Sequence, residues 1–299
     1  MDPHILQLFA PAAIVPLVFL DRAVRWRTAR QGAPDETGVN FLLGGISLFS
    51  DGITVGAFTL FYQALAPHAA LLHIPSLPLQ FAVAIVLGDF LSYVHHRCMH
   101  AWPVLWASHI VHHQSRTIDL STGLRNHPFA MVGTCLVWGL LLPLGIRPEV
   151  MLGAAALIGT YDVLVHRSSE SPATRNRRWL GLVLNLPEHH RVHHSADAAF
   201  YDSNYALLFI VWDRLLGTYR APQPAMARFG VPGAPATGRV RTLLWAEWMR
   251  LLRRPPPEGG AEAEAEAEAD SGLSVGLAVY LGAVAALALM ALLLGFPPV

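Results

Sequence analysis

Apolar residues fall into long blocks along the chain, and short polar segments separate these blocks. A helix needs about 20 apolar residues to cross a bilayer core about 30 Å thick. Six blocks approach or exceed this length, and we expect five or six of them to span a membrane. They are residues 5–20, 39–66, 77–94, 129–146, 150–165 and 272–296.

The pattern predicts an all-α fold, a polytopic helical membrane protein. Only Arg147, Pro148 and Glu149 separate the fourth block from the fifth, which predicts a tight helical hairpin. The alternative for one or two blocks is a re-entrant or interfacial segment. Residues 245–252 have the pattern of an interfacial amphipathic helix.

The arginines predict the orientation of the chain. Basic residues mark cytoplasmic loops, and arginines follow the first, third and fifth blocks, whereas the connection after the second block has no Lys or Arg. Arg147 is the exception. The simplest topology therefore places both termini outside, and it places every histidine cluster on the cytoplasmic side of an integral, multi-pass membrane protein.

Composition supports this class and narrows the function. Hydrophobic residues make up 53% of the 299 residues and charged residues 14%, whereas about a quarter of the residues of a soluble domain are charged. The 21 Lys and Arg balance the 21 Asp and Glu, which argues against a polycationic surface for nucleic acid. Cys98 and Cys135 are too few for a disulfide framework.

The blocks and the polar segments divide the chain into four regions. Residues 1–74 hold the N-terminal transmembrane helices and a loop, and residues 75–222 hold the histidine clusters. Residues 223–271 form a polar cytoplasmic segment that ends in a low-complexity Glu-Ala linker, and residues 272–299 carry the C-terminal transmembrane helix.

Histidine is the residue that points to chemistry, because twelve of the fifteen histidines lie between His95 and His194. Residues at i, i+3 and i+4 share a helical face, so imidazoles at this spacing can point at one metal. Three clusters have this spacing, and two single histidines close to block ends can join them. The ten candidate ligands are His96, His100, His109, His112, His113, His127, His166, His190, His193 and His194.

Ten candidates exceed the four to six ligands of one ion, so we expect two metal ions. Imidazole suits zinc, iron and copper alike, and ligand type alone does not choose among them. A nitrogen-rich dinuclear site at a membrane surface favours activation of O₂ against an apolar substrate. Asp89 and Tyr93 lie on the same helical face as His96 and are placed to orient it through hydrogen bonds, and Asp162 lies one turn before His166.

Residues 77–219 resemble the fatty acid hydroxylase and sterol desaturase superfamily of integral-membrane, histidine-rich di-iron oxygenases. The combination of motifs carries the resemblance, and no single motif would. The motifs are Asp89-x-x-x-Tyr93-x-x-His96-Arg97-x-x-His100, Trp106-x-x-His109-x-x-His112-His113, Arg125-x-His127-Pro128, His166, Pro187-x-x-His190-Arg191-Val192-His193-His194, Asp202-x-Asn204-Tyr205 and Trp212-Asp213-Arg214-Leu215-Leu216-Gly217-Thr218-Tyr219.

The resemblance implies a cytoplasmic helical cap in which the ten histidines hold two iron ions. It implies O₂-dependent hydroxylation or desaturation of a lipid from the bilayer, and we favour hydroxylation. Because no haem-binding cytochrome domain is recognisable, it also implies an external ferredoxin or cytochrome with its reductase. The implied residues that line the site or support the ligands are Asp89, Tyr93, Asp162, Asp202 and Asn204.

Two other functions fit a histidine-rich membrane protein. A metallohydrolase would normally carry a carboxylate base beside its ligands, as in the sequence HExxH; this motif is absent, and Glu188 before His189 is only a partial substitute. A metal transporter should place polar residues or broken helices near the bilayer midplane, but these histidines gather at the ends of the blocks. The lipid itself and the oligomeric state stay open.

Overall fold

The computed structural model describes residues 36–167, 179–223, 228–234 and 239–252. These residues form helices and loops with two isolated β-bridges and no strand, which confirms the all-α prediction for this part of the chain. The first and last predicted spans lie outside the described residues, and so does the Glu-Ala linker.

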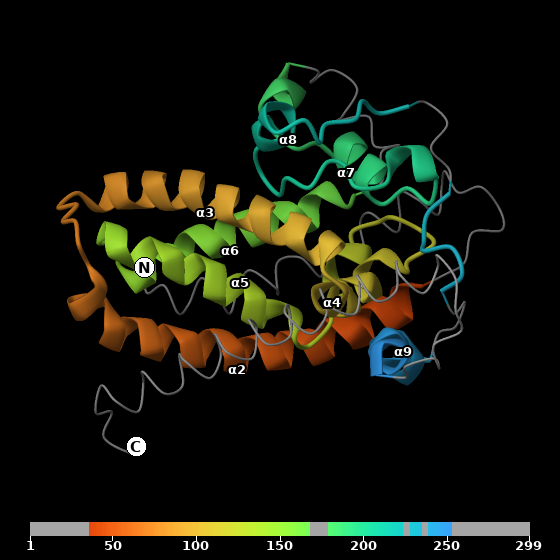
Figure 1. Ribbon diagram of the computed structural model, residues 1–299, viewed down its shortest axis with the longest axis horizontal. Coiled ribbons are helices and arrows are strands. Elements are labelled where there is room, and N and C mark those ends of the chain that lie inside the picture. Colours follow the sequence, from red (N-terminus) through yellow and green to blue (C-terminus); the bar gives the residue numbers. More distant parts are fainter. Residues whose placement is uncertain (1–35, 168–178, 224–227, 235–238, 253–299) are drawn as a thin grey trace, which may run out of the picture.

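Within the described residues, three helices are long and apolar enough to cross a membrane. They are α2 (Thr37–Ala69), α3 (Leu77–Ala101) and α6 (Pro148–Val165), and they run alongside one another in Figure 1. They match the second, third and fifth predicted blocks. We therefore describe them as membrane helices, in agreement with the predicted integral membrane protein.

The fourth predicted block forms a shorter helical segment. Helix α5 (Ala130–Trp138) continues directly into the 3-10 helix η2 (Gly139–Leu144), which contains Pro143 and is capped by Gly145. Gly145 has a φ of 72°, and a Cβ there would lie 2.1 Å from the carbonyl oxygen of Leu72. Glycine is thus required for the turn that leads into α6.

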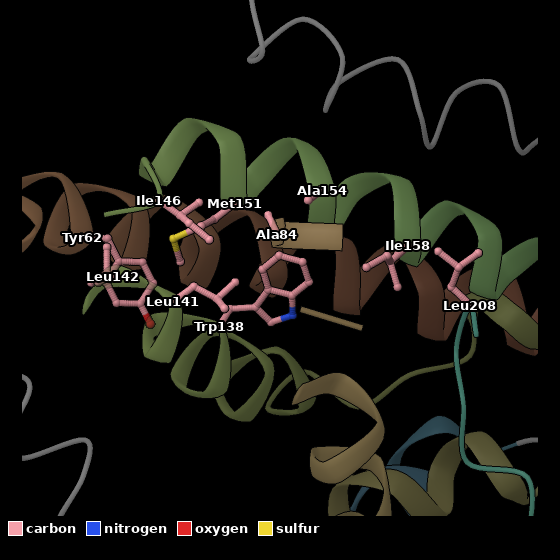
Figure 2. Packing of buried hydrophobic residues seen from close by; sticks show 10 residues of the cluster. All are labelled: Tyr62, Ala84, Trp138, Leu141, Leu142, Ile146, Met151, Ala154, Ile158 and Leu208. Carbon is pink, nitrogen blue, oxygen red and sulfur yellow. The ribbon is translucent and has the colours of Figure 1, made fainter. Parts of the chain in front are cut away.

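The core of the membrane domain lies between α3, α5, η2 and α6. Helix α3 packs against α4, α5 and α6, and α2 packs against α5 and α6. Figure 2 shows the buried residues of this core, with Trp138 at its centre and Ile158 of α6 next to Leu208 from the far part of the chain. A residue that follows the last histidine cluster therefore packs within the membrane-domain core.

The remaining helices gather toward one end of the bundle (Figure 1). They are α4 (Pro103–His113), α7 (Pro187–His193), α8 (Val211–Leu215) and α9 (Val240–Leu252), with the 3-10 turns η1 (Thr122–Leu124), η4 (Leu180–Leu182) and η5 (Ala198–Phe200). Helices α3, α4, α6 and α7 each have a proline in the first turn, where the missing N–H is not needed. A single extended residue, Trp102, separates α3 from α4.

Candidate metal centre

Nine of the ten predicted ligands lie in two adjacent groups at the end of the bundle. Within each group the candidate ligand atoms all lie within 4.8 Å of one another. The larger group contains His96, His100, His109, His113 and His193, and the smaller group contains His112, His166, His190 and His194. The rings of His113 and His194, one from each group, are 4.4 Å apart.

The helical spacing divides the second and third histidine clusters between the two groups, whereas His96 and His100 of the first cluster both lie in the larger group. On α4, His109 and His113 are separated by four residues and serve the larger group, whereas His112 serves the smaller one. The cluster at α7 makes the opposite division, with His190 and His194 in the smaller group and His193 in the larger. The sequence pattern predicted one shared face for each cluster. The structure agrees for His96 and His100, but it places the second and third clusters between the two groups, with ligands in each.

Backbone carbonyls fix the orientation of four imidazoles. The Nδ1 atom of His96 lies 2.7 Å from the carbonyl oxygen of Tyr205, and that of His193 lies 2.9 Å from the carbonyl oxygen of Ser203. A carbonyl oxygen only accepts hydrogen bonds, so each Nδ1 carries the proton and each Nε2 carries a lone pair. The other two such contacts are His112 with Arg125 at 3.0 Å and His166 with Asp162 at 2.7 Å.

The lone pairs of two imidazoles face each other in the smaller group. Nε2 of His112 lies 3.1 Å from Nε2 of His166, and both rings donate through Nδ1 to a carbonyl. Neither Nε2 atom of these neutral rings has a proton to share, so the contact is repulsive unless a cation lies between them. In the larger group, the Nε2 atoms of His100 and His193 are buried without a hydrogen-bond partner.

Burial keeps these imidazoles neutral. It lowers the pKa of His109, His112 and His113 well below the usual value, and neighbouring histidines lower it further. The same burial lowers the pKa of His190, His193 and His194. Because protonation is disfavoured, a metal ion is the cation that this donor set fits, and neutral imidazole is the form that binds metals.

A network that the sequence did not reveal supports His112. The buried guanidinium of Arg125 donates to the carbonyl of Val111 at 2.6 Å and to Oδ1 of Asn40 at 3.2 Å, and it pairs with Glu36 at 3.7 Å. The backbone carbonyl of the same Arg125 accepts the hydrogen bond from Nδ1 of His112. Glu36 and Asn40 lie outside the histidine motifs, so no motif pointed to them.

The structure corrects the prediction that Asp89 and Tyr93 orient His96. The carboxylate of Asp89 accepts hydrogen bonds from the backbone N–H groups of Leu208 and Phe209. The Tyr93 hydroxyl lies 2.9 Å from Oγ1 of Thr218. These two side chains meet the chain that returns after the third histidine cluster, and the Tyr205 carbonyl holds His96 instead.

The other three predicted supporting residues have mixed outcomes. Asp162 contacts His166 through its backbone carbonyl, not through its carboxylate. The Asp202 carboxylate lies 4.0 Å from Nδ1 of His100 and accepts a hydrogen bond from Tyr205. The Asn204 side chain bonds to the backbone of His189 and Arg220, which is a structural role.

His127 is the predicted ligand that the structure keeps apart from both groups. Its Nδ1 accepts a hydrogen bond from the N–H of Phe129 at 3.1 Å, and its ring packs against Trp245 and Trp248 of α9. His127 therefore joins the Arg125-x-His127-Pro128 segment to α9, and its place beside the ligand clusters in the sequence did not distinguish this role.

Comparisons with known proteins agree with this geometry. Residues 81–218 match the family described as Fatty acid hydroxylase. The alkylglycerol monooxygenase of Homo sapiens is 35% identical over 133 residues, which are 44% of this chain and 29% of that protein. The alkylglycerol monooxygenase of Xenopus tropicalis is 27% identical over 219 residues, 72% of this chain and 47% of that protein.

A bacterial relative is named for a different lipid. The ornithine lipid hydroxylase OlsE of Rhizobium tropici is 29% identical over 166 residues, 55% of this chain and 49% of that protein. The chain thus spans half or less of the length of these curated relatives. No solved structure gives a significant match. The matched residues 81–218 hold both histidine groups, and this part of the chain belongs to the fatty acid hydroxylase family.

Proposed function

We propose that this protein is a membrane-bound di-iron oxygenase that hydroxylates an unactivated C–H bond of a lipid, with O₂ and electrons from an external donor. The observation that carries the proposal is the pair of facing lone pairs on His112 and His166, 3.1 Å apart in a buried cluster of nine histidines. The names of the relatives, alkylglycerol monooxygenase and ornithine lipid hydroxylase, support a lipid as the substrate class.

The chemistry of the donor set supports redox activity over hydrolysis. Among the described residues each group consists of histidines alone. The carboxylate of Asp202 lies 4.0 Å from His100 and is hydrogen-bonded to Tyr205, and it does not reproduce the base that HExxH places between two ligands on one helix. Iron held by the two groups would supply the activation of O₂. Neutral imidazoles bind iron without adding negative charge, and the histidine-only donor set therefore favours the di-iron oxygenase.

The residues of this chain hold the ligands in position and limit access of water. The backbone carbonyls of Tyr205, Arg125 and Ser203 accept hydrogen bonds from the Nδ1 atoms of three ligand histidines. These bonds turn the Nε2 atoms toward the centre of the site. Such supporting contacts typically change metal affinity or activity by 10- to 100-fold when lost. All nine candidate ligands except His100 are buried, which keeps the site largely dry. We further propose that the site faces the cytoplasm, as the arginine pattern predicts.

The first test measures oxygen insertion into lipid. Cells that express the wild-type chain are grown under ¹⁸O₂, and their lipid extracts are compared by mass spectrometry with those of cells that express His112→Ala. We expect a lipid that gains one labelled oxygen only with the wild-type chain, and close to two irons in each purified wild-type chain. We expect His112→Ala to reduce turnover by at least 100-fold.

A matched control separates loss of a ligand from loss of the protein. His73→Ala removes an exposed histidine outside both groups, and it should keep both the product and the iron. A loss of two hydrogens without added oxygen would indicate desaturation in place of hydroxylation. Wild-type turnover in His112→Ala, or stoichiometric zinc after expression with ample iron, would contradict the proposal.

A further inference from the structure

Five large apolar side chains are exposed at η4 and α8. Trp179 is 69% exposed, Leu182 62% and Leu215 70%, and we call them, with Val183 and Leu216, the η4–α8 patch. The guanidinium of Arg214 in α8 donates to the carbonyl of Gly181 in η4 at 2.9 Å, so the two elements form one surface. Apolar side chains gathered in this way mark an interface with protein or membrane.

Contacts with α3 fix the depth of the segment that carries the patch. The Asp89 carboxylate accepts hydrogen bonds from Leu208 N–H at 2.9 Å, Phe209 N–H at 3.0 Å and Trp212 Nε1 at 2.8 Å. Asp89 is twelve residues beyond Leu77, where α3 begins. With a rise of 1.5 Å per residue, this point lies about 18 Å along the helix, and Figure 1 shows α8 above the second half of α3 rather than beyond its end.

Contacts with α6 give an independent measure of the same depth. The Tyr161 hydroxyl donates to the carbonyl of Asn185 at 2.6 Å, and Asn185 N–H donates to the carbonyl of Leu208 at 2.8 Å. Tyr161 is thirteen residues beyond Pro148, the first residue of α6, which corresponds to about 20 Å along that helix. Leu208 also packs with Ile158 of α6 in the membrane-domain core (Figure 2).

Both depths are smaller than the thickness of a bilayer core, which is about 30 Å. We propose that the η4–α8 patch is immersed among the acyl chains of the bilayer leaflet on the metal-centre side. The occupant is lipid because the segments that carry the patch are hydrogen-bonded to α3 and α6 partway along these membrane helices, and not beyond their ends. By contrast, His100 lies about 35 Å along α3, beyond the core. The proposal rests on the membrane helices and not on the proposed reaction.

Spin labels test this placement in the full chain. In a background of Cys98→Ser and Cys135→Ala, single cysteines replace Leu182 and Leu215, and the labelled protein is placed in nanodiscs of phosphatidylcholine and phosphatidylglycerol. Power saturation then measures collisions with O₂, which concentrates in hydrocarbon, and with a water-soluble nickel chelate. We expect the O₂-to-nickel ratio at both positions to match that of a label at Val86, a 44% exposed residue of α3.

A label at Ala199 provides the aqueous reference, because this exposed residue of η5 lies near Asp202, which is 4.0 Å from His100 at the far end of α3. We expect the ratio at Leu215 to exceed that at Ala199 by several-fold. A ratio at Leu215 equal to that at Ala199 would place the patch in water and overturn the proposal. Exclusion of both reagents would indicate a protein partner and would overturn it as well.

Hydroxyl-radical footprinting gives a second measurement on the unmodified chain in the same nanodiscs. It compares Trp179 with Trp102, which is 47% exposed and follows directly after α3. We expect Trp102 to be oxidised and Trp179 to be protected, although Trp179 is the more exposed of the two in the protein itself. Faster oxidation of Trp179 than of Trp102 would contradict the proposal.

Discussion

At the scale of single residues, the candidate metal centre takes its donor atoms from side chains and the orientation of those side chains from backbone carbonyls. Nine of ten predicted ligands converge, because the i, i+3 and i+4 spacing depends only on helix geometry. The groups that hold them are carbonyls of Tyr205, Arg125, Ser203 and Asp162. Every residue has a carbonyl, so the sequence carries no signal for those that are used. His127 shows the converse, since its ring packs on α9, a helix more than a hundred residues further along the chain.

The buried His127 predicts a pH dependence of stability. Burial lowers the pKa of His127 from 6.5 to about 4. Between these values the unfolded chain binds the proton and the folded chain does not, so stability is complete above pH 6.5 and falls toward pH 4. The shift corresponds to at most roughly 3 kcal/mol. We expect the melting temperature to fall less on acidification from pH 7.5 to 5 in His127→Asn than in the wild type.

This comparison isolates His127 from the other buried histidines, since both chains share them. Differential scanning fluorimetry of the two proteins in the same detergent gives the difference in slope. Parallel pH profiles would show that His127 does not titrate in this range on unfolding, and they would refute the prediction.

At the scale of elements, apolar block length predicted three membrane helices closely. The length of the α-helix in the fourth block was overestimated. Gly139 and Pro143 occur in the second half of this block, which forms the 3-10 helix η2 and not a continuation of α5. The elements around the histidine groups were less accessible to prediction, since they are short. Five-residue α8 and three-residue η4 leave little periodicity to detect, and their positions depend on distant partners such as Asp89.

The packing of α3 against α5 predicts the effect of one added methyl group. A Cβ on Gly88 would lie 2.4 Å from Cη2 of Trp138, and this indole is buried and donates to Ser92 at 3.1 Å. Gly88→Ala should therefore lower stability by about 1–3 kcal/mol, as overpacking does in other cores. The measurement is the midpoint of thermal unfolding in detergent.

Gly56→Ala is the control for that substitution, because a Cβ at Gly56 of α2 would meet no atom within 4 Å. Alanine is the better helix former, so Gly56→Ala should leave the midpoint unchanged or raise it. Equal midpoints for Gly88→Ala and the wild type would contradict the prediction, because they would show that the Trp138 indole shifts to accommodate the methyl group without loss of stability.

At the scale of the whole molecule, the two histidine groups connect elements that are far apart in the sequence. Their members come from α3, α4, α7 and the end of α6. Ions bound there would stabilise the folded chain, since the unfolded chain has no assembled site. Removal of metal with a chelator should lower the melting temperature by on the order of 10 °C.

His73→Ala should show the same drop as the wild type in that experiment. His112→Ala lacks a ligand of the smaller group only, so it should begin below the wild type and show a smaller drop. Thermal unfolding followed with and without chelator, together with metal analysis of each sample, checks both expectations. Identical melting curves for the wild type with and without chelator would show that bound ions do not contribute to the stability of the fold.

The position of Asp89 constrains how this protein is synthesised. Its three hydrogen-bond donors lie 119 to 123 residues later in the chain, so α3 leaves the ribosome and enters the translocon well before they exist. During that interval a carboxyl group sits in a nascent membrane helix without its native partners, at an energetic disadvantage that only completed translation removes. Polypeptides terminated before Trp212 should consequently be substrates for membrane quality-control proteases, whereas chains extended past this residue should escape them.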